Sequence, residues 1–537
     1  MLWIAVHLPQ LSMESFAATV DPAWRGRPLA LIEAHRITQV DARAAGLGVQ
    51  PGAKRSTALA LAGDLVLGQA NPVRDAQALQ AAAYAALALT PMVCIESTDG
   101  AGTPAPVVLL EVQSSLRCFG GYRRLLACLQ RALQPLGHEL QIASAPTALG
   151  ATLLARWRSD LASGPHSVNL DALSQLLDDA PVWLLGPGRE HWEALQGMGL
   201  RQLSDLRHLP RSGLSRRFGT ALLDALDRAR GDAPDPREPI VCPPVFEQRI
   251  ELFTRADTAE QMMAGARVLI ARLIAWARVR QSRVAGFTLR MHHEAHRLHD
   301  AHATECPQAT QALPPPEGVR KLGSGPSFSR ELSIGLAAPS ADAAHLASLL
   351  AERLARTPLA APALEMSLYC DALVQAPAPN AELFPTRGAE REGLTRLVER
   401  LQARLGAEGV QRLALVADHR PERAAAWVPA QSALASNAAL PTLSQVPDGG
   451  PVRPLWLLRE PVPLPEKGSR PWLDGTPLQL LAGPERIESG WWDGDLAARD
   501  YFIARAHDGA LVWVFRARLP PLSAPDGTGW FLQGRFA

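Results

Sequence analysis

Two glycines one residue apart, Gly197 and Gly199, are the most informative chemical feature of this sequence. The apolar residues at 195, 198, 200, 203 and 206 predict a helix, a glycine turn and a second helix. Glycine lets the backbone turn without a Cβ clash and approach a ligand closely. Free N–H groups at the start of the next helix then suit a phosphate. Basic residues around this segment would add attraction, namely Arg201, Arg207, Arg211, Arg216 and Arg217.

This pattern is typical of a helix-hairpin-helix that holds a nucleic-acid backbone without reading its sequence. The alternative is a plain pair of antiparallel helices with a glycine turn. A repair nuclease built on the same hairpin would need acidic residues beside it, and 186–220 offers only Glu190, Glu193 and Asp205.

Neither the histidines nor the cysteines form a metal-binding pattern. The run from His292 to His302 is rich in histidine, but Arg297 stands where the H-E-x-x-H register needs its second histidine. The six cysteines have no C-x-x-C spacing, which is consistent with a reducing cytosol. We therefore expect no metal and no cofactor.

Composition indicates a soluble, multidomain protein. The chain has 537 residues, of which 47% are hydrophobic and 20% charged, and this length suggests about three to five domains. Its net charge is +1, so any contact with nucleic acid must depend on local patches. We find no secretory signal and no apolar run long enough to span a bilayer, and we expect a cytoplasmic protein without membrane contact.

Hydrophobic periodicity predicts four successive regions. Strands and helices alternate to about residue 165, and 166–240 is helical and ends at a Gly/Pro run. Residues 246–373 follow a β-α-β-β-α-β order around a Pro/Gly-rich insertion at 302–326. After a linker at 376–379 we expect a helix at 394–405, a loosely structured region at 420–470 and antiparallel strands at 478–537. The elements expected in the first region are strands at 2–8, 28–32, 107–112 and 140–143 and helices at 13–20, 75–89 and 122–136.

This order of regions resembles the Y-family DNA polymerases. The wording Gly26-Arg-Pro28, then Ala42-Arg43 through Gly52, resembles the fingers pattern of that family, and Leu116 through Gly121 resembles the segment after its second palm strand. The resemblance implies an α/β multidomain fold with a palm at 1–165 and fingers inserted at about 25–75. It also implies a helix-hairpin-helix thumb at 166–240, a β-α-β-β-α-β little finger at 243–373, a linker at 374–392 and a Pro-rich, partly β C-terminal partner-binding region at 393–537.

The catalytic positions depart from that family. Y-family polymerases bind two Mg²⁺ ions through carboxylates, because the ions activate the primer 3′-OH and neutralise the triphosphate. Here His7 and Pro9 stand in the two aspartate places of the first strand, and Glu96-Ser97 replaces the second acidic pair. Proline has no ligand atom and imidazole binds Mg²⁺ poorly. We therefore expect no catalytic residues. The alternative is an active polymerase whose metal site is rebuilt from Glu14, Glu96 and Glu111.

The whole chain resembles the catalytically degenerate Y-family polymerase-like subunit of the bacterial mutasome. The sequence segments on which this resemblance rests are 418–423, 483–492, 499–502 and 530–536. The resemblance implies a non-catalytic DNA-binding adaptor in error-prone translesion synthesis and damage-induced mutagenesis. Its implied partners are primer–template DNA, the sliding clamp, a RecA-like accessory protein and an error-prone replicative-type DNA polymerase alpha subunit. A scaffold that never touches DNA is a further alternative.

One short segment resembles the sliding-clamp-binding motif. Asn380, Leu383 and Phe384 follow the Pro-rich linker, and an extended Leu-Phe pair suits an apolar pocket on a partner. Asn380 stands where the motif has glutamine. The alternative is an apolar anchor that docks on this protein's own surface.

Two further surfaces are candidates for binding. Arginines on the first long helix and second strand of the little finger could follow DNA phosphates, namely Arg278, Arg280 and Arg283 with Arg267, Arg272 and Arg290. A solvated helix face is the alternative. Trp491 and Trp492 could form a partner surface or fill the core of a small β domain.

Overall fold

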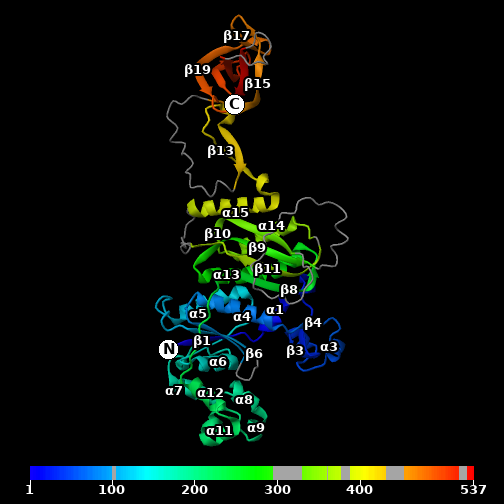
Figure 1. The fold of residues 1–537 in the computed structure, drawn as a ribbon, viewed down its shortest axis with the longest axis vertical. Helices are drawn as coiled ribbons and strands as arrows, with labels where there is room; N and C mark the ends of the chain where they lie inside the picture. Colours follow the sequence, from blue (N-terminus) through cyan, green and yellow to red (C-terminus); the bar gives the residue numbers. More distant parts are fainter. Residues whose placement is uncertain are drawn as a thin grey trace, which may run out of the picture. The chain divides into compact units, whose positions relative to one another are not determined.

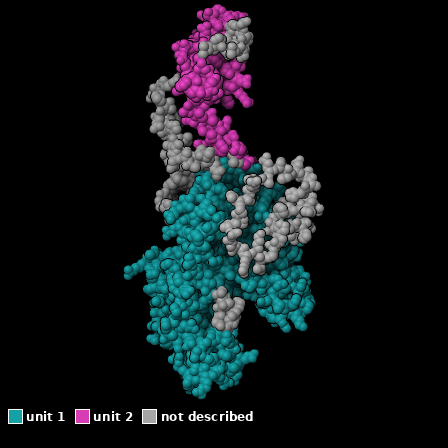
Figure 2. Space-filling model, viewed as in Figure 1, with its two compact units in different colours: residues 1–404 teal, residues 405–537 magenta. Residues whose placement is uncertain are grey.

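A computed structural model of the protein describes residues 1–98, 104–293, 329–359, 361–375, 387–430, 453–518 and 529–536. The chain divides into two compact units, residues 1–404 and 405–537 (Figure 2). Each unit has its own sheets and hydrophobic cores.

The first sheet of unit 1, which we call sheet I, has the strand order β5-β6-β1-β7 with antiparallel neighbours. Two of its strands, β1 and β6, are labelled in Figure 1. Its strands are β1 (Trp3–His7), β5 (Val93–Thr98), β6 (Pro104–Glu111) and β7 (Gln141–Ala145). Residues of α4 (Pro72–Leu87) and α5 (Tyr122–Leu133) share a core with one face, and residues of α6 (Ala148–Trp157) share a core with the other. The first strand is a continuous apolar run because both of its faces are buried.

A smaller three-stranded sheet lies in the stretch expected to form the fingers. Its order is β3-β2-β4, with β2 (Leu29–Glu33) antiparallel to β3 (Arg36–Val40) and parallel to β4 (Val66–Gln69). Three helices accompany it: α1 (Leu11–Ala17), α2 (Ala42–Gly46) and α3 (Arg55–Leu61). The helix expected at 13–20 therefore begins and ends earlier than predicted, whereas the strand expected at 28–32 is confirmed.

Short helices follow, as the sequence predicts. They are α7 (Leu170–Asp178), α8 (Gly186–Glu190), α9 (Trp192–Gly197), α10 (Leu203–Arg207), α11 (Arg211–Phe218) and α12 (Ala221–Arg230). Their leucines form one core with α6 and with one face of sheet I. The last helix is followed by Gly231, whose φ of +89° lies in the left-handed region that favours glycine.

The expected β-α-β-β-α-β order is confirmed in sheet II, whose strand order is β10-β9-β11-β8 with β12 added on β9. Its elements are β8 (Phe246–Ala256), α13 (Ala259–Val279), β9 (Ser282–His293), β10 (Ser329–Ser340), α14 (Ala343–Ala355), β11 (Ala363–Cys370) and β12 (Leu373–Gln375). Buried and exposed residues alternate along β8, so only one face of that strand packs on the core.

The helix α15 (Arg387–Leu405) is attached to unit 1 through its polar side. Glu399, which is 5% exposed, accepts hydrogen bonds from the backbone N–H groups of Ala337 and Ala338 and contacts His345 Nε2 at 2.7 Å. Leu394 and Leu397, from the apolar face that the sequence predicts, are 55% and 53% exposed. The helix is longer than the predicted 394–405, and its leucines face solvent.

Unit 2 is β-rich. Its main sheet has the order β15-β22-β21-β20-β19, and β13 (Gln411–Leu415) pairs separately with β14 (Ala425–Pro429). The sheet is formed by β15 (Trp456–Leu464), β19 (Gln479–Ser489), β20 (Ala497–Arg505), β21 (Leu511–Ala517) and β22 (Trp530–Arg535), and β16 (Glu466–Lys467), β17 (Arg470–Leu473) and β18 (Thr476–Pro477) form small ladders. The predicted antiparallel strands are confirmed.

The expectation of a loosely structured region at 420–470 is wrong for β14 and β15. Proline is tolerated at the edge of a sheet, where its missing N–H faces away from the ladder. The strand β15 lies at an edge and carries Pro461 and Pro463.

The mixed α/β fold with a β-rich C-terminal part is thus confirmed. In the described parts of the chain, the helices are all too short or too polar to cross a bilayer.

Candidate functional site

One register row of sheet I collects the residues that stand at the expected metal positions. Val107 on β6 is paired with His7 on β1 and with Glu96 on β5. Cross-strand partners project from the same face, and two strand spacings separate His7 from Glu96 by roughly 10 Å. Pro9 lies in the turn directly after β1. The side chain of Ser97 lies outside the described residues.

His7 is a neutral imidazole in this environment. Burial lowers its pKa to about 4, the hydrogen bond with the Pro106 carbonyl opposes that change, and the nearby Arg156 cation lowers the pKa further. The Nδ1 atom of His7 lies 3.4 Å from that carbonyl oxygen. A half-buried imidazole held this way is a poor ligand for a hard cation such as Mg²⁺.

Glu96 has a cationic partner from the segment that joins α12 to β8. Its carboxylate pairs with the guanidinium of Arg237, which also donates to Asp235 Oδ2 at 2.8 Å. Burial acts to lower the pKa of Arg237, but the charges of Glu96 and Asp235 outweigh it and the pKa is raised. The side chains of Arg237 and Glu96 are 17% and 18% exposed. The one acidic side chain retained in the row is therefore neutralised by an internal ion pair.

The same joining segment is held at two more points, one on α6 and one on β5 of sheet I. The Leu149 N–H donates to Asp235 Oδ2 at 3.1 Å, and the Ile240 N–H donates to the Val93 carbonyl at 2.8 Å. From the sequence alone, residues 231–236 are only a Gly/Pro breaker run, and nothing in the spacing signals that Arg237 reaches Glu96.

The alternative metal ligands are not gathered beside Glu96. Glu111 is paired with Trp3, four residues along β6 from Val107, which is roughly 13 Å along a strand. Glu14 contacts His138 Nδ1 at 3.0 Å and accepts from the Glu139 N–H at 2.9 Å. Within the described residues, no three His, Cys, Asp or Glu side chains are placed to hold a metal ion.

The glycine hairpin between α9 and α10 is present. Gly199 adopts φ +81°, and the Leu200 N–H donates to the Leu195 carbonyl at 2.9 Å to close the turn. Open space surrounds both Gly197 and Gly199, since a Cβ at either position would meet no atom within 4 Å.

The amides at the start of α10, which we expected to be free for a phosphate, are partly occupied. The N–H groups of Arg201 and Gln202 donate to Asp205 Oδ2 at 2.8 and 2.9 Å, and these bonds lower the pKa of Asp205. The expectation is wrong for these two groups because Asp205 caps the helix. The three-residue spacing from Gln202 to Asp205 resembles a capping box, and this spacing could have signalled the cap from the sequence.

The structure adds a second glycine pair, Gly186 and Gly188, at the start of α8. A Cβ on Gly188 would lie 2.2 Å from the Val182 carbonyl oxygen, so this close backbone contact requires glycine. The sequence could have signalled this second pair, because its glycines are one residue apart, as Gly197 and Gly199 are.

The arginines of this helical region divide into two groups. Arg207 pairs with Asp178 at 2.6 Å, and Arg211 pairs with Asp227 at 2.6 Å. The exposed arginines for which the described residues supply no ion pair are Arg201, Arg216 and Arg217. These three cations are available to an external anion.

The arginines on α13 and β9 do not form one surface. Arg278 is exposed, but Arg272 is 3% exposed, and Arg280 donates to the Pro243 carbonyl at 2.6 Å while lying over the Trp276 ring. The predicted continuous face is therefore wrong, because α13 packs against sheet II and α4 on different sides. Arg283 lies near the start of β9, opposite Val374.

The clamp-motif residues Asn380, Leu383 and Phe384 lie outside the described residues, as do 294–302 of the histidine run and the insertion at 302–326. The two histidines described there have internal partners. His292 Nε2 lies 3.3 Å from Ser367 Oγ, and His293 Nδ1 lies 2.7 Å from the Ala361 carbonyl.

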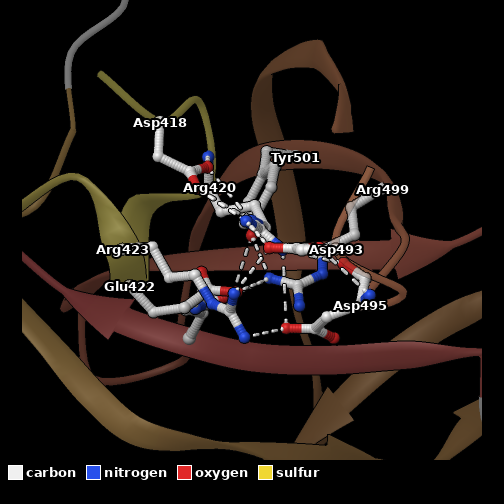
Figure 3. A network of polar contacts seen from close by, with 9 residues as sticks. Asp418, Arg420, Glu422, Arg423, Asp493, Asp495, Arg499 and Tyr501 are labelled. Atoms are coloured by element: carbon white, nitrogen blue, oxygen red, sulfur yellow. Dashed lines mark hydrogen bonds and ion pairs between the residues drawn. The ribbon is translucent and has the colours of Figure 1, made fainter. Parts of the chain in front are cut away.

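In unit 2, Arg420 is the centre of a charged network (Figure 3). This residue is 1% exposed, donates to both carboxylate oxygens of Asp418 and Asp493, and reaches the Asp495 carbonyl at 2.9 Å. The network ties the segment before β14 to the turn between β19 and β20.

The tryptophans of that turn face solvent. Trp491 and Trp492 are 78% and 55% exposed and form an edge-to-face pair. Trp513 and Trp530 fill the core instead, at 1% and 3% exposure. The core-filling alternative is therefore wrong for the Trp491–Trp492 pair.

The chain is similar to solved structures and to curated proteins. Among solved structures, the chain is similar to an insertion ternary complex of Dbh DNA polymerase, with a TM-score of 0.35 and 14% identity over 70% of this chain and 99% of that one. It is also similar to DinB from Sulfolobus solfataricus, with a TM-score of 0.33 and 14% identity over 70% of this chain and 99% of that one.

Among curated proteins, the chain is similar to Protein ImuB of Caulobacter vibrioides. In strains NA1000 / CB15N and ATCC 19089 / CB 15 the identity is 27% over 512 residues, which cover 91% of this chain and 100% of the relative. No family model matches the chain. The resemblance to an ImuB-type, Y-family-like protein is confirmed.

The ion pair of Arg237 gives the first prediction. Arg237→Met leaves the Glu96 and Asp235 carboxylates half-buried without their cation, and the free energy of unfolding should fall by about 1–3 kcal/mol. Denaturant titration measures this change. The matched control is Arg158→Met, whose ion pair with Asp160 is 45% and 67% exposed and should contribute little. Equal losses in the two variants would contradict the role given to Arg237.

Proposed function

We propose that this protein is a non-catalytic DNA-binding adaptor in error-prone synthesis past damaged DNA. It holds primer–template DNA, binds the sliding clamp and brings a second polymerase to the primer end. A tether of this kind raises the local concentration of that polymerase, so the adaptor needs no chemistry of its own. The similarity to ImuB proteins over nearly the whole chain supports a role in translesion synthesis and mutagenesis.

The absence of catalysis is supported mainly by the row that contains His7 and Glu96. Two-metal catalysis needs carboxylate oxygens that are free to bind Mg²⁺. Here one position holds a neutral imidazole, and the remaining carboxylate is paired with Arg237. A metal ion at Glu96 would have to displace that guanidinium.

Primer extension tests this proposal. Purified protein with primer–template, dNTPs and either Mg²⁺ or Mn²⁺ should add no nucleotide, because the row offers the cations no pair of free carboxylates. The products are resolved on a denaturing gel, with an active Y-family polymerase as the positive control. Nucleotide addition that Glu96→Ala abolishes would instead establish the alternative, an active polymerase with a rebuilt site.

DNA binding is supported by the exposed arginines of the helical region, and we propose that Arg216 and Arg217 contact backbone phosphates. The variant Arg216→Ala/Arg217→Ala should weaken binding and reduce the slope of log affinity against log salt by up to about 2. Fluorescence anisotropy with labelled primer–template over a salt series measures both.

The matched control for DNA binding is Arg123→Ala/Arg124→Ala, which removes two exposed arginines from α5. Because α5 shares a core with the other face of sheet I, this variant should retain the affinity of the natural protein. The scaffold alternative, a protein that never touches DNA, predicts no specific loss in the Arg216/Arg217 variant.

Clamp binding is a proposal based on Asn380, Leu383 and Phe384. Leu383→Ala/Phe384→Ala removes the two apolar side chains expected to enter a pocket on the clamp, and co-precipitation with purified clamp should fall at least tenfold, or about 1.4 kcal/mol. The control, Leu394→Ala/Leu397→Ala, removes two exposed leucines from the following helix. Undiminished capture by the first variant would refute the motif.

We further propose that the C-terminal unit binds the RecA-like accessory protein and the polymerase alpha subunit. Support comes from the exposed Trp491–Trp492 pair, since tryptophan is enriched at binding hot spots. The Arg420 network fixes the turn that carries both rings.

A further inference from the structure

A cavity of about 250 Å³ lies between α1, α4, the segment before β7 and α13, and its lining includes neither His7 nor Glu96. Residues that line it include Glu14, Ser15, His138, Arg267 and Arg272. Two polar groups in its wall are buried without the partners that such groups usually have in folded proteins.

The first feature is a buried arginine without a carboxylate. Arg272 is 3% exposed, and its hydrogen bond goes to the neutral Gln248 Oε1 at 3.3 Å. No Asp or Glu among the described residues forms an ion pair with it, and burial lowers its pKa to about 10. The guanidinium is therefore still charged at neutral pH, and a buried charge is costly unless an opposite charge or several hydrogen bonds compensate it.

The second feature is an unused hydroxyl. Ser15 is 4% exposed, and its Oγ has no hydrogen-bond partner among the described residues. Buried polar groups in folded proteins are nearly always paired. A ligand that accepts hydrogen bonds in this cavity would satisfy both Ser15 and Arg272.

The charges around the cavity favour an anion. Arg267 adds a second cation at an exposed position. The one acidic residue named in the wall, Glu14, is already engaged by His138 Nδ1 at 3.0 Å and by the Glu139 N–H at 2.9 Å. The wall therefore carries two guanidinium charges against one carboxylate that already accepts two hydrogen bonds, and it has one further donor in the Ser15 hydroxyl.

We propose that this cavity binds a phosphate group, with Arg272 and Ser15 as its buried donors and Arg267 at its entrance. A guanidinium presents two parallel N–H groups that match two phosphate oxygens, and a hydroxyl can donate to a third. The phosphate is either the free ion or the triphosphate of a nucleotide. This site is independent of the proposed adaptor role.

Binding is tested by calorimetry and thermal melting of the full chain in sodium phosphate, dATP or deoxyadenosine, against sodium chloride of equal ionic strength. Phosphate should bind with one site per chain and raise the melting temperature. Arg272→Met should weaken binding at least about tenfold and abolish the thermal shift, because it removes the buried charged donor. A larger shift with dATP than with phosphate identifies the nucleotide as the source, and equal shifts, with none for deoxyadenosine, identify the free ion.

The matched control is Arg278→Met, which removes an exposed arginine from the same helix and should bind phosphate like the natural protein. Ser15→Ala removes one donor with little change in volume and keeps the test decisive if Arg272→Met fails to fold. No binding to the natural protein, or unchanged binding by both Arg272→Met and Ser15→Ala, would overturn the proposal.

Discussion

Helix α13 takes part in two hydrophobic cores. On one side its apolar residues, such as Met262 and Leu269, pack with sheet II, and on another it packs against α4. Tyr84 of α4 belongs to the core of sheet II, while Ala275 of α13 belongs to a core of sheet I. A helix that is apolar on several sides must be covered on several sides. Sheets I and II are therefore joined through the packing of α13 and α4 in both cores.

Polar contacts reinforce this union. The Phe253 N–H donates to the Thr19 carbonyl at 3.2 Å, and Gln261 Nε2 donates to Asp21 Oδ2 at 2.6 Å. The joining segment with Arg237 is bound to the edge of sheet I. Arg272 on α13 is 3% exposed and is therefore enclosed rather than solvated. Because Arg272 is enclosed, it is not part of the surface expected to bind DNA, and its charge lies in the wall of the cavity.

Periodicity predicted the elements of this fold well. The alternating pattern of β8 arises because one face of that strand is buried, and the long apolar pattern of α13 arises because that helix packs in the core. Patterns of this kind identified the β-α-β-β-α-β order. Proline content misled the prediction for β15, since composition alone does not show that a strand lies at an edge.

The candidate site was predictable only in part. His7 and Glu96 were identified by type, and their common row follows from strand pairing. The partner of Glu96 was not predictable, because Arg237 lies 141 residues away and reaches it only through the path of the joining segment. Similarly, nothing local marks Arg272 as buried. Its burial comes from the packing of α13 against distant parts of the chain, as its hydrogen bond to Gln248 of β8 shows.

The pairing of Glu96 with Arg237 also bears on attempts to build a cation site into this row. Aspartates introduced at positions 7 and 9 would lie near a carboxylate whose charge is already balanced by a guanidinium. Freeing that carboxylate would require loss of Arg237, and that loss would remove a contact that holds the joining segment. A cation site at this row therefore needs several coordinated substitutions rather than one.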